Sequence, residues 1–111
     1  MVRNNELPKT IRICGKDYKV KYPKNKPFAN IRGIGKHIEC NATHNYETST
    51  IKVWYPLYAS KDYIMEKIIH ECLHGIENAM KIELGEITIK VMACHIQALL
   101  KDNPKLLELL K

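Results

Sequence analysis

The strongest constraint on this chain is the pattern His70-Glu71-Cys72-Leu73-His74, an H-E-x-x-H motif inside a segment with helical periodicity. Histidines four residues apart in a helix lie one turn above each other on one face, so both imidazoles can bind the same cation. Glu71 would then lie beside the coordination position left open for water. The motif predicts a helix that carries most of a metal site, and the competing interpretation is an ordinary helix whose histidines face solvent.

The motif lies in a predicted helix over residues 60–81. Ser60 is a suitable N-cap, and Asp62 in the first turn favours the positive end of the helix dipole. A broad apolar face anchors this helix, and His70 and His74 lie at its edge, where they can look into a cleft. The stripe predicted for this face consists of Ile64, Ile68, Cys72 and Ile76, widened by Met65, Ile69, Leu73 and Met80.

The N-terminal half has the pattern of strands. Residues 10–22 alternate apolar and polar side chains around residues 15–17, which is typical of a β-hairpin, and residues 49–55 form a strand that ends before Pro56. Between them, residues 28–35 read as a turn or a brief helix, and residues 35–44 as a strand followed by an Asn/Thr-rich turn. Residues 1–8 are expected to be a loose leader.

The C-terminal part predicts two more helices. Gly85 marks a turn, residues 86–101 form a second helix antiparallel to the first, and Asn103 and Pro104 begin a short third helix as its N-cap and first residue. Strands followed by helices indicate the α+β class. We therefore expect residues 1–111 to form a single domain with a small antiparallel sheet of three or four strands and helices packed on one face.

Composition narrows the functional classes. No apolar run approaches the roughly 18 residues that a membrane span needs, and no secretory signal is visible at the N-terminus, so we expect a cytoplasmic protein. Four widely spaced cysteines are expected to be free thiols, with Cys72 and Cys94 buried on helices. The net charge of +6 could attract nucleic acid, but no nucleic-acid-binding motif accompanies it, and a solvated basic surface is the simpler interpretation.

A catalytic zinc needs a third protein ligand beyond His70 and His74. Glu83, Glu86 and His95 are the candidates in and after the turn. If the two helices lie side by side, the rise of 1.5 Å per residue favours His95, whereas an early end of the first helix would bring Glu86 within reach. Helix spacing alone leaves this choice open.

One further cluster of metal-binding residue types lies before the motif. His37, Cys40 and His44 follow an H-x-x-C-x-x-x-H spacing. We expect them on a loop without a fourth partner, and therefore do not interpret them as a site.

Three segments together resemble a known family. IIHECLHGI (residues 68–76), LGE (84–86) and AxxIxALLKDNP (93–104) are similar to small metallopeptidase-like proteins of phages and prophages, related to the ImmA/IrrE and SprT-like zincins. The resemblance covers roughly residues 50–107. It implies a minimal zincin in which an edge strand, matching residues 50–55, runs beside the active-site helix. It also implies Zn²⁺ ligands at His70, His74 and Glu86, with Glu71 as the catalytic base.

The sequence therefore predicts a zinc-dependent peptidase. Glu71 would take the proton of a metal-activated water, and the strand at residues 50–55 would hold an extended peptide by strand addition. Tyr55 or Tyr58 could help to stabilise the oxyanion. The alternative is a catalytically inactive zincin-like scaffold that binds a protein partner or nucleic acid through its basic N-terminal half.

Overall fold

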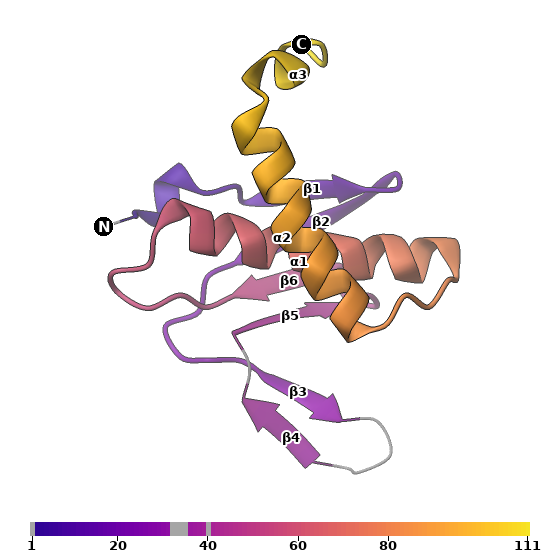
Figure 1. The fold of residues 1–111 in the computed structure, drawn as a ribbon. Helices are drawn as coiled ribbons and strands as arrows, with labels where there is room; N and C mark the ends of the chain where they lie inside the picture. The colour runs from indigo at the N-terminus through magenta and orange to yellow at the C-terminus, as the bar shows by residue number, and fades with distance from the viewer. Residues whose placement is uncertain (1, 32–35, 40) are drawn as a thin grey trace.

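A computed structural model describes residues 2–31, 36–39 and 41–111 and has the α+β architecture expected from the sequence (Figure 1). A four-stranded sheet lies beneath two long helices, and a two-stranded sheet extends from it. The elements in chain order are η1 (Asn4–Glu6), β1 (Thr10–Ile13), β2 (Lys16–Lys21), β3 (Phe28–Ile31), β4 (Lys36–Glu39), β5 (Ala42–Asn45), β6 (Thr50–Val53), α1 (Lys61–Met80), α2 (Glu86–Asp102) and α3 (Pro104–Glu108).

The predicted N-terminal hairpin is confirmed. β1 and β2 pair antiparallel, with Ile13 opposite Lys16, which leaves a two-residue turn at Cys14 and Gly15. Both turn residues have positive φ values, 49° and 82°, as in the tight turns whose twist matches that of the flanking strands. The turn therefore comes earlier than the sequence indicated, because Lys16 already belongs to β2.

The expectation of a purely antiparallel sheet is wrong. The strand order is β1-β2-β6-β5, and β6 pairs parallel with β2 but antiparallel with β5. Because β6 has a partner on both sides, residues 50–55 do not supply an edge strand. β5 lies at the edge of this sheet instead, and it is formed by residues whose sequence predicts a turn.

The segment before β5 forms the smaller sheet. Phe28–Ile31, expected to be a turn or a brief helix, is strand β3, and it pairs antiparallel with β4. β4 confirms the strand predicted after residue 35. Residues 32–35 and 40, on which parts of these expectations fall, lie outside the described residues.

The core consists of two clusters that share α1. In the first, Ile51 and Val53 of β6 are fully buried against Ile64 of α1. In the second, Leu73 of α1 packs with Ile89 and other residues of α2. Burial of apolar surface at about 25 cal/mol per Å² makes these contacts the main force that holds α1 between the sheet and α2.

Helix α1 begins and ends close to the predicted residues. The Ser60 side chain accepts a hydrogen bond from the Tyr63 N–H at 3.1 Å, which confirms the N-cap. The buried residues of α1 pack partly on the sheet and partly on α2. The predicted apolar face is nevertheless broader than the surface that is buried. Three of its members are exposed: Met65, Ile76 and Met80.

The two chain ends differ from the sequence expectations. Residues 2–8, expected to be loose, pack on the sheet: Val2 joins the core, and the Tyr22 hydroxyl donates to the Pro8 carbonyl at 2.6 Å. Pro104 begins α3 as predicted, but the Asn103 side chain donates to the Leu99 carbonyl and does not cap α3. None of the described helices is long and apolar enough to span a membrane.

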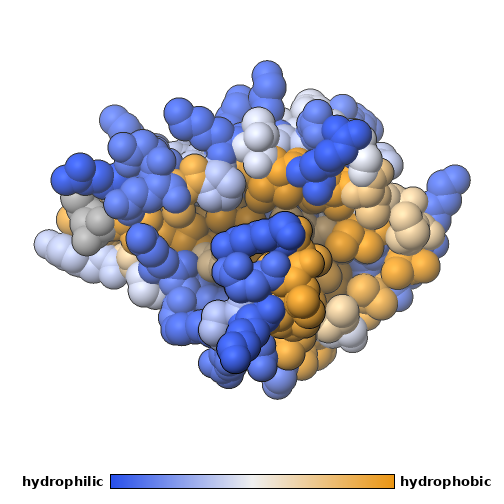
Figure 2. Space-filling view, turned by 90° about the horizontal axis from the view of Figure 1, so that it is seen from above, coloured by the Kyte–Doolittle hydropathy of each residue, from blue (hydrophilic) through white to orange (hydrophobic). Residues whose placement is uncertain are grey.

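Helix α3 and the end of α2 project away from the sheet (Figure 1). Figure 2, which looks down on this end of the molecule, shows apolar surface beside strongly hydrophilic side chains. The exposed apolar residues of this end are Leu99, Leu106, Leu107, Leu109 and Leu110.

Candidate metal centre

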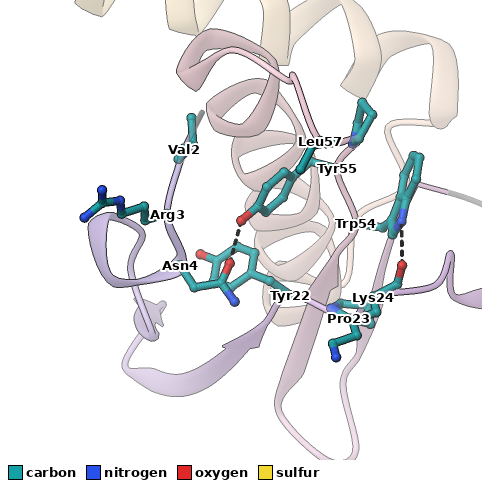
Figure 3. Close-up of a pocket in the computed structure, with 10 residues that line it drawn as sticks. Val2, Arg3, Asn4, Tyr22, Pro23, Lys24, Trp54, Tyr55 and Leu57 are labelled. Carbon is teal, nitrogen blue, oxygen red and sulfur yellow. Dashed lines mark hydrogen bonds between the residues drawn. The ribbon is translucent and has the colours of Figure 1, made fainter.

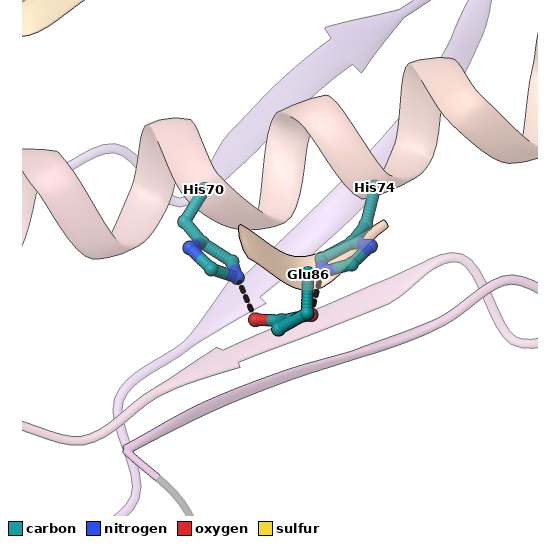
Figure 4. Close-up of side chains that lie close together, drawn as sticks. All are labelled: His70, His74 and Glu86. Carbon is teal, nitrogen blue, oxygen red and sulfur yellow. Dashed lines mark hydrogen bonds and ion pairs between the residues drawn. The ribbon is translucent and has the colours of Figure 1, made fainter. Parts of the chain in front are cut away.

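Three side chains from α1 and α2 converge at one point (Figure 4). His70 and His74 lie one helical turn apart with ring centroids 5.0 Å from each other. Their Nε2 atoms face the two carboxylate oxygens of Glu86, at 2.6 Å for His70 and 2.9 Å for His74. Each of the three residues offers one ligand atom, and these atoms lie within 4.8 Å of one another. The donor atoms of both predicted histidines and of the family-implied glutamate are therefore brought together.

The three residues differ in exposure. The side chains of His70 and His74 are only 16% and 17% exposed, whereas that of Glu86 is 67% exposed. The two imidazoles are thus mostly buried, and the Glu86 carboxylate lies on their solvent side. Such an arrangement lets an ion enter from solvent while two of its ligands are already fixed.

The connection between α1 and α2 explains why Glu86 reaches the histidines although α1 does not end early. α1 runs to Met80, and α2 begins only six residues later, at Glu86. Gly85 has a φ of 87°, which a residue with a side chain rarely adopts, and it turns the chain back towards α1. α2 then crosses α1 (Figure 1), so the side-by-side arrangement that favoured His95 does not occur.

The other ligand candidates lie outside this group. Glu83 is exposed on the connection, and the described residues place it in no cluster of ligand atoms. His95 is also exposed, and its Nδ1 lies 2.9 Å from the Val91 carbonyl in the preceding turn of α2.

Glu77 of α1 contacts Nδ1 of His74, the ring nitrogen that does not face Glu86. Glu77 Oε1 lies 3.1 Å from His74 Nδ1, and Glu77 Oε2 accepts the backbone N–H groups of Leu84 and Gly85 at 2.6 and 3.3 Å. The Leu84 N–H is the main cause of a lowered pKa at Glu77; burial acts in the opposite direction, and the His74 and Gly85 contacts lower the pKa further. Glu77 is therefore a charged acceptor for three donors.

Glu71, the predicted catalytic base, is 5% exposed and faces the edge strand. Its Oε2 lies 3.0 Å from Nδ1 of His44, which is a residue of β5. The His44 ring also stacks on the ring of His74, with centroids 5.1 Å apart and planes inclined by 11°. His44 therefore links the buried carboxylate to the group of candidate ligand side chains.

Asn78 identifies the nitrogen of His44 that carries the hydrogen. The side-chain N–H of Asn78 points at His44 Nε2 from 3.0 Å, so Nε2 acts as the acceptor. In the neutral ring the hydrogen then resides on Nδ1, which donates to Glu71. A chain of hydrogen bonds runs from Asn78 through His44 to Glu71.

The expectation that His44 lies on a loop is thus wrong, whereas the only ligand group among the described residues does not include it. It lies in a strand whose pairing with β6 was not recognised, and this strand places His44 against α1. The side chain of His37 and the whole of Cys40 lie outside the described residues. Glu77 was also missed, although its position three residues after His74 was a usable signal, since residues with this spacing are neighbours on a helix.

A cavity elsewhere on the molecule is lined neither by ligand candidates nor by Glu71 (Figure 3). It measures about 440 Å³. The Tyr55 hydroxyl points into it and donates to Asn4 Oδ1 at 2.5 Å, while Tyr58 is 88% exposed. The Tyr55 hydroxyl is therefore directed into this cavity, and the oxyanion role of Tyr58 stays a prediction. The lining residues are Val2, Arg3, Asn4, Tyr22, Pro23, Lys24, Trp54, Tyr55, Pro56 and Leu57.

The described cysteines are free thiols, as expected, but they are not all buried. Cys72 is half-buried on α1, and burial, with a smaller effect from Glu71, raises its pKa to about 11. Cys14 and Cys94 are exposed, so the expectation of a buried Cys94 is wrong.

The chain was compared with protein-family models, with curated proteins and with solved structures, and none of them matches it.

Proposed function

We propose that this protein is a zinc-dependent peptidase in which His70, His74 and Glu86 hold the metal and Glu71 acts as general base. The observation that carries the proposal is the convergence of two imidazole Nε2 atoms on one carboxylate, within 4.8 Å, beside a buried glutamate. A minimal zincin, the class that the sequence resembles, would have such a constellation.

The donor set fits zinc. Imidazole nitrogens and a carboxylate oxygen are common ligands of Zn²⁺, and three protein ligands leave one position for water or substrate. Glu77 faces Nδ1 of His74 and Glu86 faces Nε2. Nε2 is therefore the nitrogen that can bind the metal. When bound, zinc polarises a carbonyl group and makes water more acidic.

The chain's own residues then have defined tasks. Glu71 accepts the proton from water and returns it to the leaving amine. His44 holds the Glu71 carboxylate by a hydrogen bond and keeps it against the group of ligands. The ring of His44 also covers one face of His74, which excludes water from that side.

The edge of the sheet supports a peptide as substrate. Among the described residues β5 pairs only with β6, so its other side offers backbone N–H and C=O groups. An extended peptide can add to such an edge as a further strand. We therefore assign peptide binding to β5, in place of the strand at residues 50–55.

The burial of Glu71 favours a second candidate, a zincin-like scaffold without turnover. A base that is 5% exposed and already bonded to His44 meets water only if the site opens. Such a scaffold would bind a protein or nucleic acid through the basic N-terminal half, where exposed lysines are frequent. Exposed free thiols suit a reducing compartment, so for either candidate we propose the cytoplasm.

Hydrolysis of fluorescently labelled casein by the zinc-loaded protein distinguishes the two candidates. Glu71→Gln should lower the rate about 100-fold or more while the bound zinc remains unchanged, because general-base catalysis contributes about 10²–10⁴-fold. Glu83→Gln, which removes the same charge at an exposed position outside the site, should leave the rate unchanged. Equal rates for wild type and Glu71→Gln would contradict the peptidase proposal.

A further inference from the structure

Glu77 joins two parts of the candidate metal centre that come from different elements. One of its carboxylate oxygens faces His74 Nδ1 at 3.1 Å, and the other accepts from the Leu84 N–H at 2.6 Å and from the Gly85 N–H at 3.3 Å. Its side chain is 17% exposed, so water does not readily replace these partners. Neither the H-E-x-x-H motif nor the family resemblance assigns a role to this residue.

The contact with Glu77 determines which ring nitrogen of His74 carries the hydrogen and which can bind an ion. A carboxylate can only accept a hydrogen bond, so the hydrogen of a neutral His74 ring is held on Nδ1. Nε2, which lies 2.9 Å from Glu86, then has its lone pair free for an ion. Carboxylates behind metal-binding histidines fix the tautomer and the ring orientation in this way.

The second contact determines where Glu86 lies. Leu84 and Gly85 are the last two residues before α2, and both of their N–H groups point at the same Glu77 oxygen. The carboxylate therefore ties the end of the connection to the last turns of α1. Glu86 follows directly, so its position relative to His74 depends on this tie.

We propose that Glu77 is a positioning residue that prepares two of the three zinc ligands at once, His74 through its Nδ1 and Glu86 through the backbone of Leu84 and Gly85. This inference deepens the proposed function and rests on the zinc site assigned there. Glu77 itself does not touch the ion or the substrate.

Glutamine cannot fill this role, although it has the same shape. Glu77 offers two oxygens to three N–H donors, whereas the side chain in Glu77→Gln would offer one oxygen and a further N–H₂ group. If the amide oxygen faces Leu84 and Gly85, the N–H₂ group points at His74 Nδ1 and favours the hydrogen on Nε2, the nitrogen that must bind zinc. If the amide turns round, the two backbone N–H groups lose their acceptor.

The test measures zinc affinity by competition with a chromophoric chelator for wild type, Glu77→Gln and Glu83→Gln. Glu77→Gln should bind zinc about 10- to 100-fold more weakly, as is typical when the partner of a metal-bound histidine is removed. Glu83→Gln carries the same charge change on the same connection but should match wild type. Circular dichroism verifies that both variants are folded.

Nitrogen-15 NMR of the histidine-labelled, zinc-loaded wild type and Glu77→Gln proteins gives a second readout, which does not depend on affinity. His74 should bind zinc through Nε2 and carry a hydrogen on Nδ1, and this signature should change in Glu77→Gln. Equal zinc affinities of Glu77→Gln and Glu83→Gln, or coordination by His74 Nδ1, would overturn the role of Glu77 and leave the zinc site standing. Failure of the wild-type protein to bind zinc would overturn both.

Discussion

His44 and Glu71 form a hydrogen-bonded pair across the boundary between the edge strand and α1, with 3.0 Å between Nδ1 and Oε2. The side chains are 22% and 6% exposed, so the carboxylate has lost most of its water. A buried carboxylate without a donor is costly, and His44 is the side chain that supplies one. The pair therefore contributes to stability and also fixes the residue that we propose as the base.

Replacement of His44 by alanine should lower the free energy of unfolding by about 1–3 kcal/mol, because it leaves a buried acceptor unsatisfied. Urea unfolding of the metal-free protein measures this loss. His95→Ala removes an exposed histidine of α2 and should change stability by less than about 0.5 kcal/mol. Similar losses of unfolding free energy in the two variants would show that the His44 contact does not stabilise the fold.

Gly75 of α1 faces Ile13 of β1. A Cβ atom at this position would lie 3.0 Å from Ile13 Cδ1 and 3.3 Å from Ile13 Cγ2. Alanine in a helix interior normally gains about 0.5–1 kcal/mol over glycine. Here the overpacking, typically about 1–3 kcal/mol, outweighs that gain because Ile13 is itself buried.

We therefore expect Gly75→Ala to destabilise the protein by about 1 kcal/mol in urea unfolding. Ile13→Val removes Cδ1, the closest atom, so the double variant Ile13→Val/Gly75→Ala should be more stable than the sum of the two single effects predicts. An increase in stability for Gly75→Ala alone would mean that Ile13 moves aside without cost.

Tyr22 makes the fold sensitive to alkaline pH. Burial, with a smaller effect of Tyr55, raises its pKa from 10.0 to about 12, and its hydroxyl donates to the Pro8 carbonyl. Because the folded state holds the proton more tightly than the unfolded state, this stability is fully present below pH 10 and is lost as the pH rises towards 12.

Unfolding in urea at about pH 9 and about pH 11 measures this effect. Wild type should lose more stability between the two values than Tyr22→Phe, which has no proton to release. Parallel losses in the two proteins would contradict the assignment to Tyr22.

Much of the fold could be predicted because its signals are local. Alternating side chains around Gly15 predict the hairpin, and Ser60 and Pro104 predict the starts of two helices correctly. β5 was not predicted, since its Thr43 and Asn45 are residue types common in turns. Its strand conformation depends on pairing with β6, and local patterns do not contain such pairings.

The sequence also predicts part of the candidate site. The spacing of His70 and His74 places both on one helix face, and the structure brings them together as expected. The choice between Glu86 and His95 depended on the connection after α1, which is shaped by the contacts of Glu77 with backbone N–H groups. His44 was missed because its strand was missed.

We propose that His70, His74 and Glu86 together form one zinc site. The most direct test is the zinc content of protein purified without added metal and then titrated with Zn²⁺, for wild type, His70→Ala and His95→Ala. We predict one tightly bound zinc per chain in wild type and in His95→Ala, and a loss of that zinc in His70→Ala. Equal zinc contents in wild type and His70→Ala, or no zinc in either, would contradict the account.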